Sequence, residues 1–218
     1  MNLSNLTTTS NLLLAWRRIT TASNINYKQF FRPVIGAYEL DLSNNLSELR
    51  RKIIDGEYEA KESLRIFMPT SSGLQRPITL LCLEDQIVLQ ALTNLFAEKI
   101  RKRREELEGT AVFSHLLNPH GSIFFVKEWQ EGYFALEANL LDLFSKGNRW
   151  MATFDLSAFY ATLDHNQLLR VISPRRGGED LTSKAQLWFQ KWSSNRTHYK
   201  HGIPQGPQHP GCWLNVFS

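Results

Sequence analysis

The spacing of apolar residues changes several times along this chain of 218 residues. Leu42, Leu46, Leu49 and Ile53 recur at intervals of four, three and four, which is the period of one buried helix face. Gly56 then supplies a stop signal, because glycine readily takes the left-handed conformation that ends helices. Short apolar runs interrupt such helical stretches, and the alternation predicts an α+β fold of mixed α/β character.

Two apolar runs, 64–68 and 77–81, flank a polar tip and predict a β-hairpin. The other expected elements are helices over 11–55, from Glu84 onward, over 127–146 with an end at Gly147, through 168–172 and over 183–192, and an apolar strand over 149–155. The sequence shows neither an internal repeat nor a low-complexity linker.

Composition excludes several classes of protein. Hydrophobic residues make up 42% and charged residues 21%, which is ordinary globular usage, and 25 basic less 21 acidic side chains leave a net charge of +4. Cys82 and Cys212 are the only cysteines, so a disulfide scaffold or a four-cysteine zinc site is excluded. No apolar run approaches the ~20 residues of a membrane span, and the polar, uncharged start at 1–10 is unlike a signal peptide. We therefore expect a soluble, cytoplasmic protein with reduced thiols.

Asp155 ends the expected strand over 149–155. A carboxylate at the end of a buried strand lies at the rim of a sheet, where it can bind a hard cation such as Mg²⁺. Tyr160, five residues later, could form a wall of a pocket beside that ion. The alternative is that Asp155 caps the next turn, and the spacing does not choose between them. Asp164 with Gln167 three residues on matches a capping box, so capping is the favoured interpretation of Asp164.

Two further segments suggest ligand contacts. Gly202 and Gly206 flank a Pro-Gln step, which predicts a tight exposed turn that presents Gln205 and permits close approach of a ligand. Arg76 lies just past the hairpin tip, where its guanidinium could bind a triphosphate. The alternatives are an ordinary Gly/Pro loop and an ordinary surface arginine.

Five cations fall within six residues near the expected end of the long helix: Lys99, Arg101, Lys102, Arg103 and Arg104. This density of positive charge indicates phosphate binding, together with Arg175 and Arg176 of a basic, glycine-rich loop. The alternative is a solvated helix end, where cations are favoured by the helix dipole.

The order and spacing of these segments resemble the reverse transcriptases, particularly the prokaryotic branch with group II intron, retron and phage-defence enzymes. The family's Gly-x-x-Arg-Pro hairpin and Leu-x-Asp-x-Ile-Val-x-x-Ala helix are matched by Gly73, Arg76, Pro77, Leu83, Asp85, Ile87, Val88 and Ala91. Its first palm motif is matched by Asp155, Tyr160, Leu163, Asp164 and His165, and its Gly-x-Pro-Gln-Gly motif with a later Asn by Gly202, Pro204, Gln205, Gly206 and Asn215. The resemblance extends over residues 42–218.

The resemblance implies the fingers and an incomplete palm of a right-hand polymerase, with a helical region over 1–60, fingers over 61–149 and a partial palm over 150–218. It implies RNA-templated DNA synthesis by two Mg²⁺ ions acting on a DNA primer and deoxynucleoside triphosphates. The implied roles are metal binding by Asp155 and by the Leu156 carbonyl, a steric gate against ribonucleotides at Tyr160, triphosphate contact by Arg76, and contact with the base pair and template by Gln205 and Gly206.

Three positions depart from the family pattern. Two of these departures are single residues: Thr70 stands where a lysine is usual, and Pro210 stands where a small residue is usual. The third is that the position of the family's Asp-Asp pair has no counterpart, because no Asp-Asp occurs in the sequence. We therefore expect this chain to be inactive as a polymerase by itself, with a second polypeptide segment or chain completing the palm. The alternative is a non-catalytic nucleic-acid-binding or assembly subunit of a reverse transcriptase system.

Overall fold

The computed structural model describes residues 2–21, 25–69, 73–156, 158–172, 179–193 and 200–204. Of residues 25–30, 76, 171, 172, 179 and 180 it describes the backbone only. Its elements are, in chain order, α1 (Leu3–Leu6), α2 (Thr9–Thr21), α3 (Ile25–Glu39), α4 (Leu42–Asp55), β1 (Leu64–Pro69), β2 (Gln75–Leu80), α5 (Leu83–Leu107), α6 (Trp129–Ser145), α7 (Phe159–Thr162), α8 (His165–Ile172) and α9 (Glu179–Trp192).

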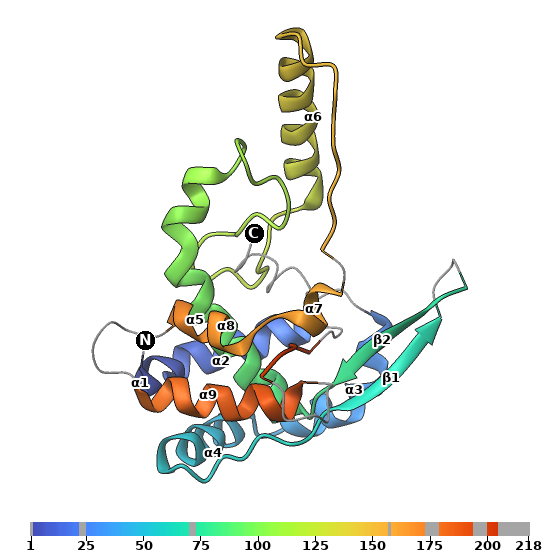
Figure 1. Ribbon diagram of the computed structural model, residues 1–218. Coiled ribbons are helices and arrows are strands. Elements are labelled where there is room, and N and C mark those ends of the chain that lie inside the picture. Colours follow the sequence, from blue (N-terminus) through green and yellow to red (C-terminus); the bar gives the residue numbers. More distant parts are fainter. Residues whose placement is uncertain are drawn as a thin grey trace.

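Most of the described residues are helical, and the two strands among them form one small sheet, which confirms the expected α+β class. The leucine-rich face of α4 is buried as its period predicts, through Leu46, Leu49 and Ile53. Gly56 ends this helix in the left-handed conformation, with φ 78°. The expected hairpin also forms: β1 and β2 are antiparallel, with Ile66 opposite Ile78, and they extend away from the helices (Figure 1).

Helix α5 is the centre of the molecule (Figure 1). Its first fourteen residues or so are buried on almost every side, because α2, α8 and further segments pack around them. Asp85, buried in its first turn, accepts hydrogen bonds from the Tyr58 hydroxyl and from the Lys61 amide at 3.0 Å. Burial and the neighbouring Asp85 raise the pKa of Tyr58 well above its usual value. These bonds fix the segment that leads into β1.

One cluster of buried apolar side chains joins all three regions expected from the sequence. Leu12 and Leu49 come from the first region, Ile87 and Phe96 from the second, and Leu168, Trp188 and Trp192 from the third. We call this helical part, without α6, the body.

A second region projects from the body (Figure 1). We call residues 129–156 the arm: helix α6 runs outward, Gly147 follows it with φ 98°, and the chain then returns toward the body. At the foot of the arm, Gly132 lies against the backbone of Phe113, where a Cβ would stand 1.7 Å from the carbonyl oxygen. Only a glycine permits this approach, so α6 starts from a closely fitted contact.

The strand expected over 149–155 does not form. These residues have no regular secondary structure, and their backbone makes no hydrogen bond to another residue that the structure describes. Trp150 is 97% exposed and Phe154 is 94% exposed. A strand needs a neighbour to pair its N–H and C=O groups, and the described residues supply none here.

Within the described residues, no helix combines the length and the apolar character that crossing a membrane requires.

Candidate functional site

The turn after Asp155 is built by α7 and the start of α8. Ala158 takes a left-handed conformation, with φ 52°, and α7 follows as one helical turn. Asp164 then caps α8: its Oδ1 accepts the backbone amides of Asn166 at 2.6 Å and Gln167 at 3.3 Å. Slight desolvation acts to raise the pKa of Asp164, but these two hydrogen bonds outweigh it and hold that pKa below its usual value. The expected capping role of Asp164 is confirmed.

The second motif segment, residues 200–204, lies directly on this turn (Figure 1). The His165 amide donates to the Lys200 carbonyl, and the Gly202 amide donates to the Leu163 carbonyl, both at 2.8 Å. One step further, the Ile203 amide donates to the carbonyl of Tyr160 at 2.8 Å. Two segments about forty residues apart in sequence therefore form one local structure.

The backbone conformation at Gly202 favours a glycine. Its φ is 91°, which residues with a side chain rarely adopt, whereas a Cβ there would make only an ordinary contact with the Ala161 carbonyl oxygen, at 3.4 Å. The sequence predicted that this turn permits close approach of a ligand. Among the described residues, the segment that approaches Gly202 is the chain's own turn at Tyr160 and Ala161.

His165 joins the two segments from inside. Its side chain is fully buried, its Nε2 bonds to the Gly202 carbonyl oxygen, and its ring lies 5.6 Å from the ring of Phe189. Burial lowers the pKa of His165, and the hydrogen bond to Gly202 offsets only part of that effect. Sequence reasoning gave this residue no role of its own. Its position three and four residues before the buried Leu168 and Leu169 was the signal that it faces the core.

Tyr160 lies at the centre of this site and is half-buried, with its ring edge-on to Phe159 at 5.4 Å. Asp155 and Leu156 precede it and are exposed, in the returning segment of the arm. Among the described residues, no partner bonds to the Asp155 carboxylate, and no group of three His, Cys, Asp or Glu side chains is placed to hold a metal ion.

The donor set therefore does not fit a complete Mg²⁺ site. Magnesium is bound by six oxygen ligands in near-octahedral geometry, usually with one or two protein carboxylates among them. The described residues offer a single carboxylate, Asp155, with the neighbouring Leu156 carbonyl. Further ligands would have to come from elsewhere, so no chemical step is assigned to a metal here.

The other implied contacts are only partly placed. The backbone of Arg76 lies in β2 opposite Met68. The Arg76 side chain, Gln205, Gly206, Arg175 and Arg176 lie outside the described residues.

The basic cluster on α5 separates into two groups. Arg101 pairs with Glu98 at 2.9 Å and donates to the Asn118 carbonyl at 2.9 Å, and Arg104 is buried and donates to the Ser114 carbonyl at 2.9 Å. These two arginines hold the loop after α5. The remaining three cations are exposed and make no ion pair with a described residue: Lys99, Lys102 and Arg103.

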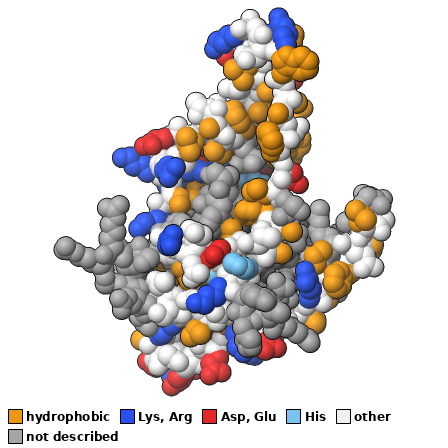
Figure 2. Space-filling model, in the orientation of Figure 1, with side chains coloured by type: hydrophobic (Ala, Val, Ile, Leu, Met, Phe, Trp, Pro, Cys, Tyr) orange, Lys and Arg blue, Asp and Glu red, His pale blue; other side chains and the backbone are white. Residues whose placement is uncertain are grey.

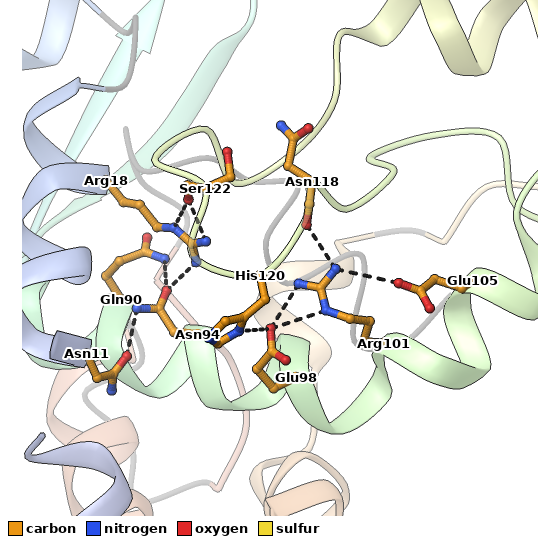
Figure 3. Close-up of polar contacts among 10 residues, drawn as sticks. All are labelled: Asn11, Arg18, Gln90, Asn94, Glu98, Arg101, Glu105, Asn118, His120 and Ser122. Atoms are coloured by element: carbon orange, nitrogen blue, oxygen red, sulfur yellow. Dashed lines mark hydrogen bonds and ion pairs between the residues drawn. The ribbon is translucent and has the colours of Figure 1, made fainter.

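Glu98 is the acidic centre of this group (Figure 3). Besides Arg101 it contacts Nδ1 of His120 at 2.8 Å. Partial burial acts to raise the pKa of Glu98, but the hydrogen bonds from Arg101 and His120 outweigh it and hold that pKa below its usual value.

A buried network beside it anchors the same loop to the body (Figure 3). Arg18 donates to the Asn94 side chain at 2.6 Å and twice to the Ser122 carbonyl, at 2.7 and 3.0 Å, and its guanidinium stacks on Phe125 at 4.6 Å. Asn94 also donates to the Asn11 side chain at 2.9 Å. Asn11 and Arg18 are seven residues apart and so lie on one face of α2, and both bond to Asn94 of α5.

Comparison with known proteins adds little about function. The chain is 25% identical over 190 residues to Protein YkfC of Escherichia coli (strain K12), a match that covers 81% of this chain and 45% of that protein. The chain thus spans about half the length of this curated relative. No protein-family model matches the chain.

Proposed function

We propose that this chain supplies the fingers and the first part of the palm of a reverse transcriptase, and that it synthesises DNA on an RNA template only together with the missing carboxylates. The observation that carries the proposal is the pairing of residues 160–165 with residues 200–204. Two motifs that share a resemblance to one enzyme family are neighbours in space, which supports the proposal that they form one site.

The proposed roles follow from this arrangement. The turn at Tyr160 is hydrogen-bonded to residues 200–204, which precede Gln205 in the sequence, so a nucleotide bound beside this pair of segments would contact both motifs. Asp155, exposed at the start of the turn, would bind one of two Mg²⁺ ions with the Leu156 carbonyl. Arg76, from the hairpin, would contact the triphosphate. The cofactor of this proposal is Mg²⁺, and its substrates are deoxynucleoside triphosphates on a DNA primer paired to RNA.

The test joins this chain to the remaining palm and thumb of a related reverse transcriptase. The joined protein should incorporate deoxynucleotides on an RNA template only with Mg²⁺, and Asp155→Asn should abolish incorporation while folding is kept. Asp142→Asn is the matched control, because Asp142 is an exposed carboxylate on α6 paired only with Lys146. Tyr160→Ala should admit ribonucleotides more readily. Full synthesis by the Asp155 variant, or none by the unchanged joined protein, would refute the polymerase assignment.

A second candidate function is a non-catalytic subunit that binds RNA. It is favoured by the incomplete donor set at Asp155 and by three exposed cations on one face of α5, Lys99, Lys102 and Arg103, which we call the stripe. Each phosphate contact changes the logarithm of RNA affinity with a slope of roughly 0.7 to 0.9 per decade of salt.

The unmodified chain is suitable for this second test. Replacing the three stripe residues by Ser should weaken RNA binding and reduce the salt slope by about two. Lys146→Ser removes an exposed cation from the arm and is the control that should leave the slope unchanged. An unchanged slope in the triple variant would mean that the stripe is a solvated helix surface.

A further inference from the structure

The peptide unit between Gly202 and Ile203 is held from both of its sides. Its N–H donates to the Tyr160 carbonyl at 2.8 Å, and its carbonyl oxygen bonds to Nε2 of the buried His165. The N–H and C=O of a trans peptide point in opposite directions, so two bonds to different partners define the orientation of the whole plane.

This orientation is otherwise weakly determined. Gly202 has φ 91°, and glycine populates positive and negative φ about equally, so its following peptide can rotate at little steric cost. Pro204 comes next and has no backbone N–H, so the Ile203–Pro204 peptide has no donor with which to continue the series. The Gly202–Ile203 peptide is thus the last one before Pro204 that is held through both a donor and an acceptor.

We infer that His165 is a positioning residue: its Nε2–H holds the Gly202 carbonyl and sets the direction in which the chain passes through Ile203 toward Pro204, next to Tyr160. Its importance for a bound nucleotide rests on the function proposed above, whereas its effect on the backbone does not.

Packing alone does not account for an imidazole at this place. The Nδ1 atom of His165 is buried and has no hydrogen-bond partner among the described residues, and such an unpaired polar group destabilises a buried site. A phenylalanine would fill the same space against Phe189 without that cost. The feature that only the histidine offers is the Nε2–H donor to Gly202, and burial keeps the ring neutral at neutral pH.

Hydrogen exchange on the 218-residue chain separates a donor role from a filling role. With His165→Phe, which keeps a ring and removes the donor, exchange at the Ile203 amide should accelerate at least tenfold, while α9 amides stay protected. With His165→Gln, which returns an N–H at a similar reach, protection of Ile203 should recover to within about threefold. If Phe protects Ile203 as well as His does, or if Gln fails to restore protection that Phe loses, the positioning role is refuted.

A second measurement does not depend on any variant folding. The ¹⁵N chemical shifts of His165 in the unmodified chain should show a neutral ring protonated at Nε2 at pH 7. A neutral ring protonated only at Nδ1 would overturn the inference, because Nε2 would then have no proton to donate to the Gly202 carbonyl.

The joined polymerase distinguishes this inference from the proposed function. His165→Phe should lower DNA synthesis at limiting deoxynucleotide at least tenfold, and Gln should restore most of it. Protection of Ile203 that depends on His165, in a joined protein that makes no DNA, would refute the polymerase and keep the positioning role. DNA synthesis that is the same with Phe as with His would refute the contribution of His165 to the site.

Discussion

The body and the arm contain similar apolar residues, but these side chains are buried in the body and exposed in the arm. Phe96 in the body is fully buried, whereas Phe154 in the arm is 94% exposed, and both belong to segments rich in large apolar side chains. Hydrophobic side chains cover much of the projecting region (Figure 2). Apolar patches of more than a few hundred Å² are rare on monomers and mark interaction surfaces. An apolar segment therefore becomes part of a core only where other segments of the chain pack against it.

The largest expected effect is a difference in stability between alanine variants of two phenylalanines, one in the body and one in the arm. Phe96→Ala should lower the free energy of unfolding by about 3–5 kcal/mol, because it removes a fully buried ring and leaves a cavity. Phe154→Ala should change it by less than about 0.5 kcal/mol, because the ring already contacts water. Urea unfolding followed by circular dichroism measures both. A large loss of stability with Phe154→Ala would show that the arm is packed in solution.

A smaller effect is expected where the body holds the loop that leads to the arm. Arg18→Met should cost about 2 kcal/mol, because it leaves the Ser122 carbonyl and the Asn94 side chain with fewer partners in a buried place. Arg17→Met, at the adjacent exposed position, is the control and should be nearly neutral. Urea unfolding of both variants is the measurement, and equal stabilities would mean that the network does not anchor this loop.

Replacing a glycine by alanine should change stability in opposite directions at the foot of the arm and in α3. Gly132→Ala should destabilise the protein by about 1–3 kcal/mol, because the new Cβ would overlap the Phe113 carbonyl. Gly36→Ala in α3 has open space around its Cβ and should stabilise by up to about 1 kcal/mol. Thermal unfolding compares the two. A neutral Gly132 variant would indicate that α6 shifts freely against the loop at Phe113.

The smallest effect is a dependence of stability on pH that arises in the body. Burial lowers the pKa of His165 in the folded protein, with the charges of Asp164 and His201 nearby, and burial likewise lowers that of His115 beside Arg104. The unfolded chain then binds more protons below about pH 6.5, so stability is complete above that pH and is lost as the pH falls through the folded pKa.

Urea unfolding at several pH values from about 7.5 to 5 measures this dependence. His165→Gln should flatten it, because the variant has no group to titrate there. Asp142→Asn, in the arm, should leave the same dependence intact because Asp142 is exposed. An unchanged dependence with His165→Gln would place its origin in other groups.

Local patterns were sufficient for most elements of the fold. The leucine spacing predicted the buried face of α4, Gly56 predicted its end, and the two apolar runs predicted the hairpin β1–β2. The N-cap at Asp164 was also predicted, because it depends on residues two and three positions away. The strand over 149–155 was predicted wrongly, because a strand depends on a partner that the local sequence does not contain.

The candidate site was predicted only as a set of separate residues. The motif spacing marked Tyr160 and Gly202, but not that the amides of Gly202 and Ile203 bond to the turn at Tyr160. The basic cluster on α5 was marked as one group, yet Arg101 and Arg104 hold a loop while three other cations face solvent. A run of like charges says nothing about which members find a carbonyl or a carboxylate from another segment.

The sequence by itself determined the helices, the hairpin and the helix ends, because period, capping and glycine conformation act over a few neighbouring residues. Only the tertiary structure decided which of those residues carry a role. His165 became a donor to Gly202, Arg18 an anchor for Ser122, and Phe154 an exposed ring, since each outcome depends on which distant segment arrives beside it. Burial and hydrogen bonding between distant segments depend on tertiary contacts and cannot be assigned from the residue type alone.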